Sequence, residues 1–413
     1  GPGDLILGGE NTFTGDLVVL GGSTTTLTGS VDGNVNVNAG GELVLGSAER
    51  IADGANLNVD GILNTNGEET VAGFTATGTI NGSGTVSALT TNLNGATVNA
   101  NLGTGALTTE GATDLNGTSA ADTVTVAGGT LTLDGALTNN TATVNVDAGT
   151  LAANGTVAAS SVNVAAGAAL TTGEAERLNN GVALTADGTV SLGGNETIGD
   201  LSGSGSIANN GNALTVNQTS DQGFSGNITG AGGLTKQGEA GLTLGNGSDF
   251  TGAANVNEGT LTVSGELATN TINVAEEATL TTTAADLLSA TATVTADGTL
   301  NLGGDQTLNN LLGSDTGAVN IGASNLLLTG GVNFQGRING AGGSVSAGPG
   351  DLILGGENTF TGDLVVLGGS TTTLTGSVDG NVNVNAGGEL VLGSAERIAD
   401  GANLNVDGIL NTN

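Results

Sequence analysis

The sequence contains a long internal repeat. Residues 1–66 are identical, position for position, to residues 348–413, an offset of 347. This identity indicates a recurring unit of 347 residues, so that residues 1–347 form one full unit and residues 348–413 begin the next. Because repeats of an array share one structure and stack on their neighbours, we expect residues 1–413 to form one continuous solenoid without conventional domain boundaries.

The unit itself contains three sub-repeats of about 110 residues. Asp-Gly pairs recur at intervals of 127, 110 and 110 residues, beginning at Asp60, Asp187, Asp297 and Asp407. The first sub-repeat therefore carries about 17 extra residues, which lie between Thr85 and Thr123. The sequence leaves open whether they form a loop or an additional coil, and their length favours a coil.

The smallest repeat has a period of about 20 residues. Residues 124–135 alternate apolar and polar side chains on either side of a glycine turn, and residues 144–155, 162–173, 254–265 and 292–303 repeat the pattern. Alternation with period two is typical of β-strands, and Gly, Asn and Asp supply the backbone conformations of tight turns. No segment has a convincing helical pattern.

These nested periods predict an all-β fold, a parallel β-solenoid (β-helix) with 18–22 residues per coil. An up-and-down barrel would also alternate, but it would not explain the nested periods. About 20 coils spaced by about 4.8 Å would make a rod on the order of 100 Å long, with ladders of stacked Asn, Thr and Val. We expect six aliphatic side chains to face inward: Val124, Val126, Leu261, Val263, Leu300 and Leu302.

Part of the chain resembles a known family. Residues 232–244 (GGLTKQGEAGLTL), 249–252 (DFTG) and 256–263 (VNEGTLTV) resemble the autotransporter-associated β-strand repeat, and residues 350–362 form a second match. The chain departs from that motif in having Phe where Tyr is common, and Ser346 at the counterpart of Lys236. The resemblance implies a right-handed parallel solenoid exported to the bacterial cell surface as a passenger, and it leaves the export route and the binding target open.

The charge of the chain narrows its partners. Five basic residues stand against 39 acidic ones, a net charge of −34. So few cations disfavour binding to nucleic acid or to anionic lipid, and we find no apolar run long enough to span a membrane. The simplest interpretation of the acidity is a soluble, self-repelling surface; weak surface binding of Ca²⁺ is the alternative.

The residues needed for catalysis are scarce. The chain has no His, Tyr or Cys, and its cations are Lys236, Arg50, Arg177, Arg337 and Arg397. Glu49–Arg50 and Glu176–Arg177 are either acid–base couples or weak surface ion pairs, and we favour the latter. The neighbours in Glu68–Glu69 and in Glu276–Glu277 should lie on alternating sides of an extended chain, which argues against a shared carboxylate site.

Metal and ligand sites have equally little support. Residues 193–196 and 303–306 match the calcium-binding nonapeptide only in part, and we expect the Asp60–Gly61 turn to provide a positive φ rather than calcium ligands. The six Phe residues recur in register, which favours core or turn positions over ligand platforms. We therefore predict no catalytic, cofactor or metal residues.

The favoured function is structural. The chain would be the stiff shaft of an extracellular filament or adhesin, acting in attachment or biofilm matrix, with further copies of its own repeat as partners. The alternative is a solenoid that binds surface glycans or like fibres, for which the extra residues of the first sub-repeat are the best candidate site. A polysaccharide lyase or hydrolase is the least favoured interpretation.

Overall fold

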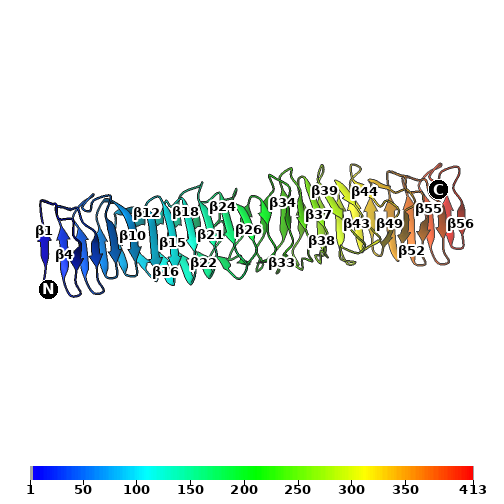
Figure 1. The fold of residues 1–413 in the computed structure, drawn as a ribbon. Helices are drawn as coiled ribbons and strands as arrows, with labels where there is room; N and C mark the ends of the chain where they lie inside the picture. The colour runs from blue at the N-terminus through cyan, green and yellow to red at the C-terminus, as the bar shows by residue number, and fades with distance from the viewer. Residues whose placement is uncertain (1–2, 413) are drawn as a thin grey trace. The chain divides into compact units, whose positions relative to one another are not determined.

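The chain is all-β. The computed structural model describes residues 3–412, which contain no helix and form about 21 stacked coils of about 19 residues. Strands of successive coils pair in parallel, as in β1 (Leu5–Leu7) with β4 (Thr24–Leu27). The predicted parallel β-solenoid is therefore confirmed, and Figure 1 shows the strands of successive coils stacked side by side. The coils divide into two compact units, one ending at Ile198 and one starting at Gly199.

In the first unit, two long parallel sheets each take one strand from successive coils. One sheet contains β4, β7 (Glu42–Leu45), β9 (Ile62–Thr65), β11 (Thr79–Gly82), β13 (Thr97–Val98), β16 (Ala112–Leu115), β19 (Thr130–Leu133), β22 (Thr150–Ala153), β25 (Ala169–Thr172) and β27 (Thr189–Ser191). The other contains β3 (Leu17–Val19), β6 (Val35–Val37), β8 (Asn56–Val59), β10 (Glu68–Ala76), β12 (Thr85–Asn94), β15 (Ala106–Glu110), β18 (Thr123–Val126), β21 (Thr143–Val146), β24 (Ser161–Val164) and β26 (Ala183–Ala186).

The second unit has the same construction with three main sheets. The longest contains β31 (Leu214–Asn217), β34 (Leu234–Gln237), β36 (Ala254–Val256), β38 (Thr271–Val274), β40 (Thr293–Ala296), β43 (Asn310–Gly313), β46 (Val332–Phe334), β49 (Gly350–Leu354), β52 (Ser370–Leu374), β55 (Glu389–Leu392) and β57 (Ile409–Thr412). The others contain β32 (Gln222–Phe224), β35 (Leu242–Leu244), β37 (Thr260–Val263), β39 (Thr279–Thr282), β41 (Thr299–Asn301), β44 (Ala318–Asn320) and β47 (Arg337–Asn339), and then β42 (Gln306–Leu308), β45 (Asn325–Leu328), β48 (Ser344–Ala347), β51 (Leu364–Val366), β54 (Val382–Val384) and β56 (Leu404–Val406).

Like residues stack on like along each unit. Val144 pairs in register with Val124 on one side and Val162 on the other, and all three side chains are buried. The six aliphatic side chains predicted to face inward are all buried. Outward-facing amides form the expected ladders, as where Asn163 Nδ2 donates to Asn145 Oδ1 at 2.9 Å. Since one coil has no core of its own, the inward-facing aliphatic ladders bury its apolar side chains against the neighbouring coils.

The extra residues of the first sub-repeat form stacked strands rather than a loop. Thr90 of β12 pairs with Gly73 of β10 and with Ala106 of β15, and Ala106 pairs with Thr123 of β18. The steps between these partners are 16 or 17 residues, so the insertion has the length of one short coil. The favoured interpretation, an additional coil, is confirmed.

The two identical segments show how much each coil depends on its neighbours. Phe360 is 0% exposed, whereas the same residue in the first segment, Phe13, is 39% exposed because no coil precedes it in the described structure. Conversely, Leu57 is 0% exposed and its counterpart Leu404 is 39% exposed at the other end. Five of the six Phe side chains are buried, as predicted, and Phe13 is the exception.

The role predicted for the Asp-Gly turns is wrong. Gly61 does not take a positive φ; a Cβ there would lie 2.2 Å from the Gly41 carbonyl oxygen of the preceding coil. Glycine is needed at this position because two backbones approach closely. Positive φ occurs instead at the glycines between consecutive strands, such as Gly129 at 67° and Gly149 at 76°.

Candidate functional site

Neither the acid–base couples nor the favoured surface ion pairs form between Glu49 and Arg50 or between Glu176 and Arg177. Arg50 Nε donates to the carbonyl oxygen of Ala48 at 2.9 Å, and its Nη1 donates to that of Thr28 at 3.2 Å. Arg177 pairs with Glu174, three residues earlier, at 3.2 Å. Glu49 and Glu176 are turned away because each takes a left-handed conformation with φ 52°, and their carboxylates accept hydrogen bonds from threonines of the next coil.

The loop that contains Glu49 is held by a recurring arrangement of hydrogen bonds, which we call the corner latch. Glu69 of β10 turns its side chain into the core, where it is 1% exposed. Its two carboxylate oxygens accept hydrogen bonds from the backbone N–H groups of Arg50 at 2.8 Å and Ile51 at 2.6 Å. One buried side chain thus holds the loop of the preceding coil, whose N–H groups would otherwise be unsatisfied.

The corner latch recurs at the sub-repeat spacings. Glu196 accepts from the N–H groups of Arg177 at 2.9 Å and Leu178 at 3.2 Å. In the third sub-repeat, Gln306 accepts from the N–H of Leu288 at 3.2 Å and donates to the Leu288 carbonyl oxygen at 2.8 Å. The partial matches to the calcium nonapeptide end at Glu196 and Gln306, so both residues serve backbone capping.

Burial raises the pKa of both glutamates that form corner latches. Desolvation raises the pKa of Glu69 from 4.5 to about 7, against the opposing effect of the two N–H donors. Desolvation likewise raises the pKa of Glu196. Strongly perturbed carboxyls can indicate active sites, but each latch carboxylate faces backbone amides of the preceding coil. The corner latches are therefore structural.

The only lysine of the chain is also buried. Lys236 points inward in a ladder between Val216 and Val256, and its Nζ donates to the carbonyl oxygens of Gln237, Gly238 and Glu258 at 2.9, 2.7 and 3.1 Å. Desolvation lowers the pKa of this amine. The aliphatic stem fills the core and the amine caps the turn, a use that the sequence analysis did not foresee.

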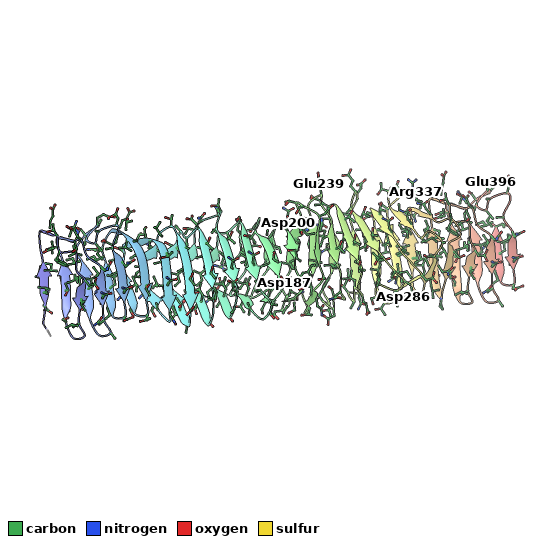
Figure 2. The ribbon with its side chains drawn as sticks, viewed as in Figure 1. Asp187, Asp200, Glu239, Asp286, Arg337 and Glu396 are labelled. Atoms are coloured by element: carbon green, nitrogen blue, oxygen red, sulfur yellow. The ribbon has the colours of Figure 1, made fainter. Side chains whose placement is uncertain are left out.

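The adjacent acidic pair Glu276–Glu277 departs from the prediction. The two residues lie in the turn between β38 and β39, where Glu277 takes φ 69°, so they are not on opposite sides of a strand. Both line a surface hollow of ≈ 460 Å³ together with Glu239 and Glu258. Figure 2 shows Glu239 at the opposite edge of the second unit from Asp286. These glutamates are not placed to share one ion, since no group of three or more His, Cys, Asp or Glu residues among residues 3–412 could hold a metal ion.

The first unit has an apolar hollow at its extra coil. It has a volume of ≈ 510 Å³ and lies where β10 and β12 turn the corner. Leu89, within the candidate insertion, is 77% exposed there. Most of the residues that line this hollow lie outside the repeated segment 1–66.

Comparison with known proteins agrees with the fold. The passenger-associated-transport-repeat family model matches residues 1–23, 234–263 and 345–370, which include Lys236 and overlap both segments noted for their resemblance. No curated protein and no solved structure gives a significant match. No helix in the described part of the chain has the length and hydrophobicity to cross a membrane. That repeat family is associated with secreted, surface-exposed proteins. Three segments of this β-solenoid thus match the passenger-associated-transport-repeat, which is characteristic of autotransporter passenger domains.

Proposed function

We propose that the chain is a structural repeat region, the stiff shaft of a secreted surface fibre or adhesin. The observation that carries the proposal is the junction between the two copies of the 347-residue repeat, which lies within the compact unit that starts at Gly199. Ser346 of β48 pairs in register with Val365 of β51, so the second copy stacks directly on the end of the first with no linker. An array joined in this way lengthens by whole coils as units are added.

The identical segments support this proposal because they reuse the same pairings. Leu5 pairs with Thr25 near the start of the chain, and their counterparts Leu352 and Thr372 pair in the second copy. Equal sequence therefore gives equal register in both copies, and register sets the position of each coil along the stack.

Other features favour a shaft over the alternatives. The buried charged groups Glu69, Glu196 and Lys236 bind backbone of neighbouring coils and are placed to maintain stacking. Sugar-binding sites commonly use exposed aromatic faces, and five of the six Phe side chains are buried. Neither arrangement favours a glycan-binding or catalytic face.

The test is to measure length against repeat number. Chains with one, two and three 347-residue units would be imaged by electron microscopy. At about 19 residues per coil and about 4.8 Å per coil, each unit should add on the order of 90 Å of unbranched rod. Particles that gain mass without gaining length, or that bend freely at each junction, would contradict the shaft.

A further inference from the structure

Two neighbouring coils of the first unit lack a corner loop. The preceding coil turns this corner through residues 52–55, and the following coils turn it through residues 103–105 and 120–122. Strands β10 and β12, by contrast, run through the corner without interruption over nine and ten residues. The missing loops leave a depression between the loops on either side, which we call the corner groove.

The corner groove has an apolar floor with a hydroxyl-bearing border. It is lined by Asp53, Gly54, Thr70, Val71, Ala72, Ser87, Ala88, Leu89, Thr104, Gly105 and Asp122. Leu89 projects outward at 77% exposure. Gly105 cannot be replaced by a larger residue that would fill the space, since its φ is 108° and a Cβ would lie 2.1 Å from the Ala88 carbonyl oxygen. The volume of the corner groove, ≈ 510 Å³, lies in the range of small-molecule binding pockets.

The charges of the corner groove select its occupant. Carboxylates stand at its two ends, Asp53 and Asp122, and no lysine or arginine lines it. Asn139 Nδ2 donates to Asp122 Oδ1 at 3.0 Å, which holds this carboxylate at its corner. A second copy of the chain, at −34, would be repelled, as would anionic lipid or nucleic acid. Charge complementarity therefore requires a cationic partner with an apolar centre.

The spacing of the coils sets the length of that partner. Four coil steps separate Asp53 from Asp122, because the adjoining strands pair in the order β8, β10, β12, β15 and β18. At about 4.8 Å per step the two carboxylates are about 19 Å apart along the stack. A peptide in the extended polyproline II conformation rises about 3.1 Å per residue and covers that distance in about six residues. Because this conformation has about three residues per turn, the residue midway between the two ends faces the same side as they do, towards Leu89 at the middle of the groove.

We propose that the corner groove docks an extended segment of a partner protein, with basic residues about six positions apart and an aliphatic residue midway between them. The aliphatic side chain packs on Leu89 and Ala72, and the basic side chains reach Asp53 and Asp122. This site would give one sub-repeat of each unit a binding role beyond that of a spacer.

The probe is a fluorescein-labelled heptapeptide with lysine at both ends and leucine at its centre, titrated by anisotropy at 150 mM NaCl. We expect one site per chain, and about tenfold weaker binding to Leu89→Ser, since burial of one leucine contributes about that factor. The double variant Asp53→Asn/Asp122→Asn should weaken binding and flatten its salt dependence. Ile62→Ser and Asp147→Asn, which change an exposed aliphatic and an acid outside the groove, should have no effect.

Several outcomes would overturn the proposal. Equal binding by Leu89→Ser and the parent would mean that the peptide follows the general negative charge. Equal binding by a heptapeptide with glutamate at both ends would remove the role of Asp53 and Asp122. Self-association of the chain that Leu89→Ser abolishes would assign the groove to a second copy. Circular dichroism of each variant confirms that folding is unchanged, as expected for exposed positions.

Discussion

The corner latch makes a quantitative prediction about pH. The Glu69 carboxyl is buried, and its pKa is raised from 4.5 to about 7 in the folded chain. A carboxyl whose pKa is higher in the folded than in the unfolded state binds protons preferentially when folded. Its contribution to stability is therefore complete below about pH 4.5 and is lost as the pH rises through about 7.

The magnitude follows from the size of the shift. Between pH 4 and pH 8 the loss amounts to about 3 kcal/mol, at about 1.4 kcal/mol for each pH unit between the two pKa values. Glu69→Gln removes this loss, but it replaces one of two hydrogen-bond acceptors, which costs about 1 kcal/mol. The variant should therefore be more stable than the parent by about 2 kcal/mol at pH 8 and slightly less stable at pH 4.

Amide hydrogen exchange is the suitable assay, because each coil contacts only its neighbours and the effect should be local. At pH 8, corrected for the intrinsic exchange rate, we expect roughly thirtyfold slower exchange at Ile51 in Glu69→Gln, because the N–H of its counterpart Leu288 donates to Gln306 Oε1 in the third sub-repeat. Glu68→Gln, which removes an exposed charge one residue away, is the matched control and should change little. Gln306→Glu should introduce a pH dependence of the same sign in the third sub-repeat. Equal exchange in Glu69→Gln and the parent at pH 8 would refute the reasoning.

Three further predictions concern packing and charge. Val263→Asp buries an unpaired charge and should cost several kcal/mol in denaturant unfolding, so a variant as stable as the parent would mean that the strand phase is wrong. Gly61→Ala places a Cβ against the Gly41 carbonyl and should lower the melting temperature, whereas Gly128→Ala, which has open space, should not; equal melting would contradict the close approach. We expect millimolar calcium to promote association of purified chains, by light scattering, more than sodium chloride of equal ionic strength, and identical responses would remove any metal role.

The periodic features could be predicted from the sequence because stacking repeats one pattern on every coil. Alternation placed Leu261 and Val263 in the core, and the length of the insertion indicated a coil. These inferences use only the period of the chain, which backbone pairing converts directly into register.

The buried charged residues were missed because their chemistry contradicts the alternating pattern. Glu69 and Lys236 are charged, so hydropathy places them at the surface, yet backbone groups at the corners bind them in the core. One signal was present, since Glu69, Glu196 and Gln306 follow the same 127- and 110-residue intervals as the Asp-Gly pairs. The corner groove could not be foreseen, because it arises from loops that two coils lack.

The stacking of one repeat copy on the next is tested most directly by a disulfide across their junction. The chain has no cysteine, so an introduced pair reports on itself alone. Ser346 and Val365 pair in register across the junction, and parallel neighbours lie about 4.8 Å apart, within reach of a disulfide. We predict that Ser346→Cys/Val365→Cys oxidises readily while Ser346→Cys/Asp363→Cys, two residues out of register, does not. Faster oxidation of the second pair, or none in the first, would contradict the account.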